Sequence, residues 1–269
     1  MRKDGFTYEG GRVLCCDAFS ATGLVKHGFS TKKRGASTGI FSSLNLGVHT
    51  KDHPDNVEQN FSLFCGDVSI DSGHLVLSQQ VHGTAIYRAG EQDRGKGLYR
   101  ESDLAEIDGL VTDEPGVALA TFYADCTPIL FLDPEKKVIA SVHSGWRGTV
   151  QKIAQRAVMT MRKEYGCKSE TILVAMGPSI KQCHFEVDED VYLEFLLHFR
   201  GMAEKSTIKK NGKYYIDTDA LNVYSLLQMG ILQEHIHTCG LCTHCNEELF
   251  FSHRRDGETG RMCAVIELQ

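Results

Sequence analysis

The stretch Ala118–Gly148, ALATFYADCTPILFLDPEKKVIASVHSGWRG, contains three short β-rich runs that decide the fold. Apolar residues fill Val117–Phe122, Pro128–Leu132 and Val138–Val142, and polar turns separate these runs. Short β-rich runs bounded by Pro, Asp and Lys are typical of buried strands. Cys126 and His143 then lie at strand ends, which is where α/β sheets usually carry their chemistry.

The composition is that of an ordinary globular protein. The chain has 269 residues with 42% hydrophobic and 24% charged residues, which is enough to bury a core. Its net charge of −6 gives no basic field for nucleic acid. The N-terminal residues have no signal-peptide core and no run is long enough to span a membrane, so we expect a cytoplasmic protein with no membrane partner. In that compartment the ten cysteines favour free thiols or metal ligands over disulfides.

Periodicity predicts one mixed α/β domain over residues 1–269, with no repeat and no linker. Asn211-Gly212 predicts a hairpin over Thr207–Asp217, and Gly10-Gly11 predicts another over Gly5–Cys16. Further strands are expected at Val25–Ser30, Leu75–Ser78, Thr84–Arg88, Asp108–Asp113, Thr171–Met176 and Met262–Leu268. Helices are expected at Asp55–Gly66 with Asp52 or Asp55 as its cap, Thr149–Tyr165, Glu189–Phe199 and Ala220–Met229.

His82, Cys126 and His143 are candidate metal ligands. Each follows an apolar run and lies beside Gly, Asp or Ser in a turn-like context. A catalytic zinc takes three protein ligands of this kind and keeps one position open. The three residues are too far apart in the sequence for zinc-finger spacing. A thiol hydrolase pair of Cys126 and His143, or a buried structural cysteine, therefore remain alternatives.

Two neighbouring groups also suit chemistry. Asp125 is either a general base or the cap of its turn. Ser144-Gly-Trp-Arg-Gly148 precedes the expected helix, so its free N–H groups together with Arg147 suit an anion.

The C-terminal tract contains six potential metal ligands, namely His235, His237, Cys239, Cys242, His244 and Cys245. These residue types bind zinc or copper, but the tract lacks the second paired half of a zinc ribbon. A loop of reduced thiols is an equal alternative, so we expect Cys239 and Cys245 to be dispensable for chemistry. Arg254-Arg255-Asp256-Gly257 is either an ion-paired loop or part of a substrate site.

Together these motifs resemble the laccase-domain, or multicopper polyphenol oxidase-like, family of the YfiH/YlmD type. The matching blocks span nearly the whole chain: Phe41–Gly47 (FSSLNLG), Ser78–Gly83 (SQQVHG), Asp108–Asp113 (DGLVTD), Ala124–Cys126 (ADC), His143–Thr149 (HSGWRGT), Met176–Ile180 (MGPSI) and Phe250–Arg261 (FFSHRRDGETGR). Two segments depart from the family pattern. They are Lys33–Ser37, where paired glycines are usual, and Cys183-His184, where adjacent cysteines are usual.

The resemblance implies mixed β-sheets sandwiched between helices, similar to the catalytic domain of cytotoxic necrotizing factor toxins. It implies Zn²⁺ bound by His82, Cys126 and His143. It also implies purine nucleosides and phosphate as substrates, with phosphorolysis of adenosine, inosine or methylthioadenosine and deamination of adenosine. Within the matched blocks we expect Asn45, Gln80, Ser144 and Arg147 to bind substrate, and Asp125, Cys126 and Arg147 to take part in catalysis.

Copper-dependent phenol oxidation is the alternative function attributed to this family. Such oxidation needs several copper ions with many histidine ligands, and the matched core blocks contain only His82 and His143. The nucleoside function is therefore favoured. A non-catalytic metal-binding or redox protein would explain only the thiol-rich tract, and no obligate protein partner is evident.

Overall fold

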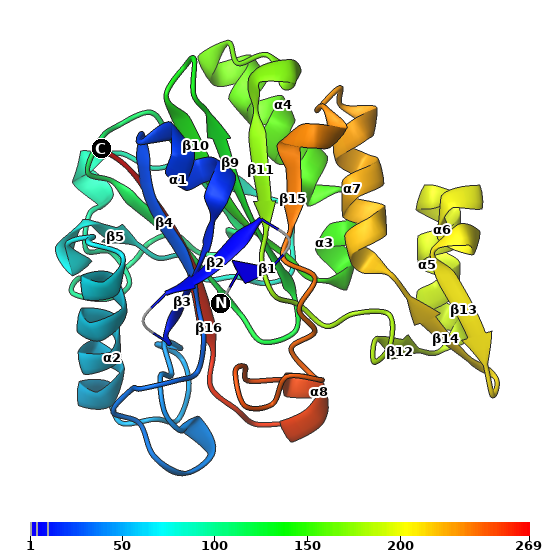
Figure 1. The fold of residues 1–269 in the computed structure, drawn as a ribbon, viewed down its shortest axis with the longest axis horizontal. Helices are drawn as coiled ribbons and strands as arrows, with labels where there is room; N and C mark the ends of the chain where they lie inside the picture. Colours follow the sequence, from blue (N-terminus) through cyan, green and yellow to red (C-terminus); the bar gives the residue numbers. More distant parts are fainter. Residues whose placement is uncertain (1, 4, 10) are drawn as a thin grey trace.

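The computed structural model describes residues 2–3, 5–9 and 11–269. Two facing β-sheets form the centre of the fold (Figure 1). The first sheet has the strand order β1 (Arg2–Lys3), β2 (Phe6–Glu9), β3 (Val13–Cys16), β4 (Val25–Ser30), β16 (Met262–Leu268), β8 (Ala118–Tyr123) and β5 (Leu75–Val76). The second has the order β15 (Ile236–Thr238), β11 (Leu173–Met176), β9 (Thr127–Asp133), β10 (Val138–Ser144), β7 (Gly109–Thr112) and β6 (Ile86–Arg88).

Three apolar cores define the layers. Side chains of both sheets, such as Leu119 and Leu130, fill the space between them. The outer face of the first sheet packs against α2 (Pro54–Asp67). The outer face of the second packs against α4 (Ile153–Tyr165) and α7 (Thr218–Gln228). Both sheets contain parallel and antiparallel pairs. The expected fold, with mixed sheets between helices, is therefore confirmed.

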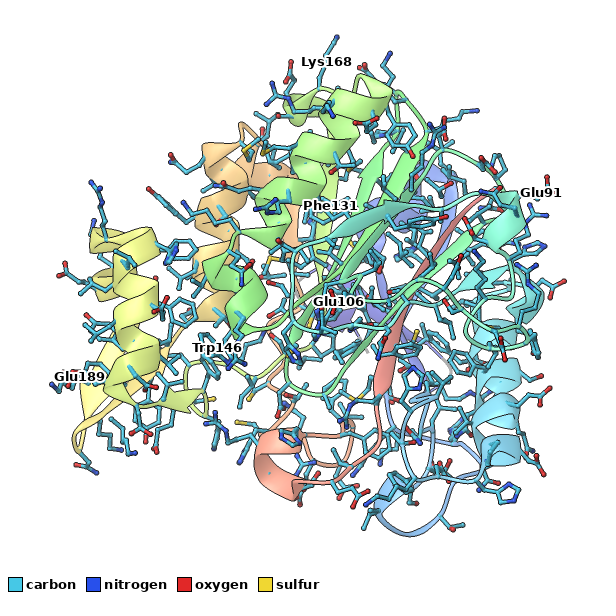
Figure 2. All side chains as sticks on the ribbon, turned by 180° about the vertical axis from the view of Figure 1, so that it is seen from behind. Glu91, Glu106, Phe131, Trp146, Lys168 and Glu189 are labelled. Atoms are coloured by element: carbon cyan, nitrogen blue, oxygen red, sulfur yellow. The ribbon has the colours of Figure 1, made fainter. Side chains whose placement is uncertain are left out.

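A fourth core lies beside this sandwich. It joins α3 (Trp146–Val150) to α5 (Glu189–Phe199), α6 (Gly201–Lys205) and a small sheet of β12 (Glu186–Val187), β14 (Lys213–Ile216) and β13 (Thr207–Lys210). The rings of Trp146 and Phe195 lie 6.5 Å apart, so the start of α3 contacts α5 (Figure 2). Two further α-helices of the described residues are α1 (Asp17–Thr22) and α8 (His253–Asp256).

Several elements have the bounds that the sequence predicts. The strands at Val25–Ser30 and Met262–Leu268 and the helix at Glu189–Phe199 match. Asn211 and Gly212 adopt φ of 51° and 77°, which is what a type I′ hairpin turn requires. The two strands of the N-terminal hairpin pair as expected, and Gly10 of its turn lies outside the described residues.

Two helix predictions were wrong in detail. The cap of α2 is His53, whose ring Nδ1 accepts from the Asp55 N–H at 3.3 Å, because the Asp52 carboxylate is taken up by Asn45 and the His53 N–H. The helix expected at Thr149–Tyr165 is two helices broken at Lys152, which has φ 63°. Val150 packs into the fourth core, beside the sandwich, and Ile153 packs against the second sheet, so the chain must turn between them.

The loop whose shape the family pattern left open is fixed by α2. Asn60 of this helix accepts from the Ala36 N–H and donates to Ser37 and to the Asn45 carbonyl. A side chain at Gly35 would lie 2.1 Å from the Ser43 carbonyl oxygen, so the loop closes only over glycine. None of the ten cysteines, all of which lie in the described part of the chain, forms a disulfide. None of the helices in the described part of the chain has the length and apolarity that crossing a bilayer demands.

Candidate metal centre and cavity

Cys126, His143 and His82 meet where the two sheets come together. Cys126 lies in the turn by which the chain passes from β8 in the first sheet to β9 in the second. His143 lies near the end of β10, opposite Pro128 of β9. His82 follows β5 in a loop and adopts φ 63°. One ligand atom from each of the three lies within 4.8 Å of the others, and the two imidazole rings are 4.9 Å apart.

Gly145 makes this convergence possible. A Cβ atom at this position would lie 2.5 Å from His82 Cδ2 and 3.2 Å from Cys126 Sγ. Any side chain here would therefore push the imidazole away from the thiol. The contact with His82 and Cys126 therefore explains why the Ser144–Gly148 motif has glycine at position 145.

Asp108 orients both histidines, and sequence analysis missed this role. Its Oδ1 accepts from His143 Nδ1 at 2.8 Å, which turns His143 Nε2 towards the thiol. The same carboxylate accepts the backbone N–H groups of Val81, His82 and Gly83 at 2.8–3.0 Å. Histidine ligands commonly have such a carboxylate partner. The sequence contained a signal for Asp108, since this residue is the first of the matched block Asp108–Asp113.

The thiol and imidazole are strongly polarised. Burial raises the pKa of the Cys126 thiol, but the charge of His143 and hydrogen bonds from both histidines outweigh burial and lower it to about 6. Burial lowers the pKa of His143, but the Cys126 thiolate and the Asp108 hydrogen bond raise it to about 9. The site therefore stabilises a thiolate facing a positive charge. A metal ion held by the same atoms would take the place of the His143 proton.

The three side chains lie on the wall of a cavity of ≈ 560 Å³. Of the residues expected to bind substrate or act in catalysis, Gln80, Asp125, Ser144 and Arg147 also line it. Basic and aromatic residues complete much of the wall: His49, Phe122, Trp146, His253, Arg254 and Arg261. A cavity of this size with convergent polar groups suits a small polar molecule.

Asn45 is not brought to the cavity wall. Its side chain is fully buried, and its Nδ2 donates to Thr50 and Asp52. Its Oδ1 accepts from the N–H groups of Gly47 and Arg261. All its hydrogen-bonding groups are thus used within the protein. Asn45 orders the segments of Gly47 and Arg261, which line the cavity in its place.

Gln80 and Ser144 line the cavity with their polar atoms already engaged. The Gln80 amide pairs with the backbone N–H and C=O of Phe122 at 2.7 and 2.9 Å. The Ser144 hydroxyl contacts Thr149 and Asn222. Arg147 differs, because its guanidinium lies 4.3 Å from the Trp146 ring centre and no carboxylate of the described residues is within ion-pair distance.

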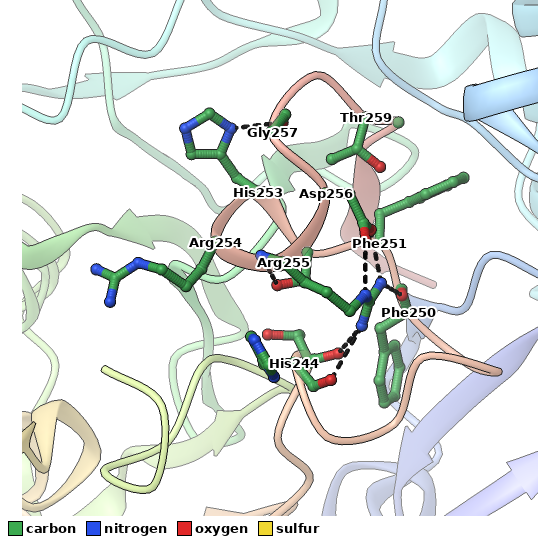
Figure 3. A network of polar contacts seen from close by, with 12 residues as sticks. His244, Phe250, Phe251, His253, Arg254, Arg255, Asp256, Gly257 and Thr259 are labelled. Atoms are coloured by element: carbon green, nitrogen blue, oxygen red, sulfur yellow. Dashed lines mark hydrogen bonds and ion pairs between the residues drawn. The ribbon is translucent and has the colours of Figure 1, made fainter. Parts of the chain in front are cut away.

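The Asp125 carboxylate is held on both oxygens. Its Oδ1 accepts from the Thr243 hydroxyl at 2.6 Å, and its Oδ2 accepts from the Arg254 N–H in the first turn of α8 at 2.7 Å. Asp125 itself has φ 91°. Arg255, which follows Arg254 in the chain, donates to the carbonyls of Thr243, His244 and Phe250 and pairs with Asp256 (Figure 3). The Arg254–Gly257 segment is therefore ion-paired at Arg255 and lines the cavity at Arg254.

We expect Asp108→Asn to weaken metal binding by His82, Cys126 and His143 by about 10–100-fold, the usual cost of losing an outer carboxylate partner. The amide can no longer accept from His143 and three backbone N–H groups at once. Competition with a chromophoric chelator measures the affinity. Asp113→Asn, at the opposite end of β7, is the matched control. Equal affinity in the two variants would contradict the role given to Asp108.

Comparison with known proteins gives a consistent result. A family model described as multi-copper polyphenol oxidoreductase laccase matches residues 26–269. Purine nucleoside phosphorylase YlmD of Geobacillus stearothermophilus is 37% identical over 98% of this chain and 97% of its own length. Purine nucleoside phosphorylase YfiH of Escherichia coli is 32% identical over 89% of this chain and 92% of its own. The crystal structure of hypothetical protein YfiH of Bacillus licheniformis superposes with a TM-score of 0.94 at 33% identity, covering 99% of this chain and 100% of that one.

Proposed function

We infer that this chain, which belongs to the multi-copper polyphenol oxidoreductase laccase family, is a zinc-dependent purine nucleoside phosphorylase that also deaminates adenosine. The observation that carries the proposal is the convergence of His82, Cys126 and His143 on the wall of a cavity large enough for a nucleoside. Two relatives, YlmD of Geobacillus stearothermophilus and YfiH of Escherichia coli, are named purine nucleoside phosphorylases, which supports the substrate class.

The donor set fits zinc. One thiolate and two imidazoles are ligands that zinc accepts, and three protein ligands leave one position open. Bound there, zinc would supply a Lewis acid and lower the pKa of a bound water to about 7. Asp108 keeps His143 in the tautomer that such binding needs.

Phosphorolysis requires the protein to hold phosphate against C1′ of the ribose. A phosphate oxygen attacks C1′, the bond to the purine nitrogen breaks, and the purine leaves with the bonding electrons and takes up a proton. Arg147 is our candidate for holding the phosphate, since no carboxylate among the described residues pairs with its guanidinium and this group suits phosphate geometry. The five-residue helix α3 adds only a short dipole, so Arg147 carries the larger part. Inosine and methylthioadenosine have the same C1′ bond and are substrates of the same kind.

Deamination requires a base beside the purine. The oxygen of a water attacks C6 of adenosine while the base accepts a proton from that water. The base then passes the proton to the amino group, the C6–N bond breaks, and the amino group leaves as ammonia. Asp125 is our candidate, because hydrogen bonds from Thr243 and Arg254 fix its carboxylate at the cavity wall next to Cys126. Nucleobase deaminases likewise combine a zinc site of His and Cys ligands with a carboxylate.

Phenol oxidation is the less favoured alternative. Several coppers would need more histidines near the cavity. His49 and His253 also line the cavity, but neither belongs to the His82–Cys126–His143 group. Among the described residues, His235 and His237 join no group of potential metal ligands, and His244 stacks on His184.

Chromatography of products formed from adenosine, with and without phosphate, tests the proposal. Adenine and ribose-1-phosphate appearing only with phosphate, together with inosine in either buffer, would support both activities. Unchanged adenosine combined with copper-dependent dye oxidation would overturn the proposal in favour of the oxidase.

We expect Arg147→Gln to raise the KM for phosphate by about 10–100-fold, the worth of a hydrogen bond to a charged group. Deamination, which uses no phosphate, should fall less. Initial rates at varied phosphate concentration measure the effect. Arg162→Gln on the exposed face of α4 is the control, and an unchanged KM in Arg147→Gln would remove Arg147 from the phosphate site.

A further inference from the structure

The C-terminal cysteine tract is divided between two environments. Cys239 is buried in the core between the two sheets, while Cys242 and Cys245 lie in a turn that follows β15. Beside this turn the structure places Cys183 and His184, from the connection between β11 and β12. One ligand atom from each of these four residues lies within 4.8 Å of the others.

We propose that Cys183, His184, Cys242 and Cys245 form a second, structural zinc site, separate from the cavity ligands. Three cysteines and one histidine are a common ligand set of structural zinc. Cys242 and Cys245 supply the Cys-x2-Cys half, and Cys183-His184 supply the second half that the tract itself lacks. We name these four residues the thiol cluster.

The sulfur–sulfur distances that join Cys183 to the other two cysteines are close to those of a tetrahedral zinc site, and the sulfur–nitrogen distances are somewhat shorter. Cys183 Sγ lies 3.8 Å from Cys242 Sγ and 3.6 Å from Cys245 Sγ. His184 Nδ1 lies 3.2 Å from both Cys183 Sγ and Cys245 Sγ. Tetrahedral zinc with normal bond lengths separates two sulfurs by about 3.8 Å and a sulfur from a nitrogen by about 3.6 Å. A disulfide would need about 2.05 Å between sulfurs, so the four side chains surround a point instead of pairing.

The backbone holds the two halves in register. The Ser179 N–H donates to the Leu241 carbonyl at 3.3 Å, and the Thr243 N–H donates to the Ser179 carbonyl at 3.0 Å. The Lys181 N–H donates to Cys242 Sγ at 3.5 Å, a contact that would stabilise a thiolate ligand. The ring of His244 stacks on His184 at 3.8 Å and fixes the imidazole plane. These contacts position the two segments and their ligand side chains relative to each other.

The thiol cluster is joined to the cavity wall. Thr243, which lies between Cys242 and Cys245, donates to Asp125. Arg254 donates from its guanidinium to the carbonyls of His184 and Glu186 and from its backbone N–H to Asp125. An ion in the thiol cluster would hold together the two segments that position Asp125. Its role would be to stiffen this wall.

Zinc stoichiometry tests the proposal. The purified chain should contain two zinc ions, and Cys245→Ser and Cys183→Ser should each lose one while remaining folded. The zinc of the thiol cluster is the difference between wild type and these variants, so the result does not depend on the cavity ion, which Cys126→Ser measures separately. Cys167→Ala, outside both groups, is the matched control and should keep both ions.

Thiol reactivity gives an independent measurement that needs no variant. Cys183 and Cys245 are exposed, so without a metal they should react at once with a thiol reagent. The proposal expects them to be protected until a chelator removes the zinc. Four outcomes would each overturn the proposal. They are immediate reaction of Cys183 and Cys245 with the reagent, equal zinc content in wild type and Cys245→Ser, two thiols missing under denaturing conditions because of a disulfide, and cuprous copper in place of zinc.

Discussion

Cys126→Ser should abolish zinc binding at the cavity and nucleoside turnover, while the fold remains intact. Serine is close to cysteine in shape, but its hydroxyl stays protonated where the pKa of the thiol is lowered to about 6. The loss of a direct ligand should exceed the about 10–100-fold cost in affinity that follows from losing an outer partner. Zinc analysis, product formation from adenosine and a thermal unfolding curve measure the three expectations.

Cys245→Ser provides the matched comparison for this variant. It makes the same chemical change in the thiol cluster, and it should remove the other zinc ion while leaving the cavity ion bound. If Cys126→Ser kept its zinc and its activity, the cavity ligand group would be wrong. If both variants lost all zinc, the two sites would be one cooperative unit and not the separate sites proposed.

Asp125→Asn is expected to lower adenosine deamination by about 10²–10⁴-fold, the usual worth of a positioned acid–base group. The substitution should be well tolerated by the fold. Asparagine adopts positive φ readily, and its oxygen can accept from the Arg254 N–H while its amide donates to the Thr243 hydroxyl. Only the negative charge is lost. Initial rates of inosine formation, zinc content and thermal stability separate chemistry from folding.

Thr243→Val distinguishes a base from a structural cap at Asp125. Valine removes one hydrogen bond to the carboxylate but leaves the charge in place. If Asp125 is the base, deamination should fall far less in Thr243→Val than in Asp125→Asn. If the carboxylate only caps its turn, Thr243→Val should lower the free energy of unfolding by about 0.5–2 kcal/mol, and both variants should turn over adenosine normally.

Local sequence was enough to predict most elements and the grouping of three residues. Short apolar runs broken by polar turns predicted β8, β9 and β10, and the Asn211-Gly212 turn predicted the hairpin of β13 and β14. These features depend on residues that are neighbours in the chain. The same runs placed His82, Cys126 and His143 in turn-like positions after apolar runs, and the family resemblance implied that together they bind zinc. The structure brings all three within 4.8 Å.

The other features of the site depend on how the sheets and loops pack, so they are seen only in the tertiary structure. Asp108 orients His143 across two antiparallel strands, which no local spacing reveals. Asn45 and Thr149–Tyr165 were misjudged for the same reason. Asn45 accepts a hydrogen bond from the Arg261 N–H, which comes from the far end of the chain, and the residues expected as one helix are divided between two cores. The thiol cluster joins two segments that are distant in the sequence. The sequence shows a C-terminal tract of potential ligands without its second paired half, and packing brings Cys183 and His184 beside Cys242 and Cys245.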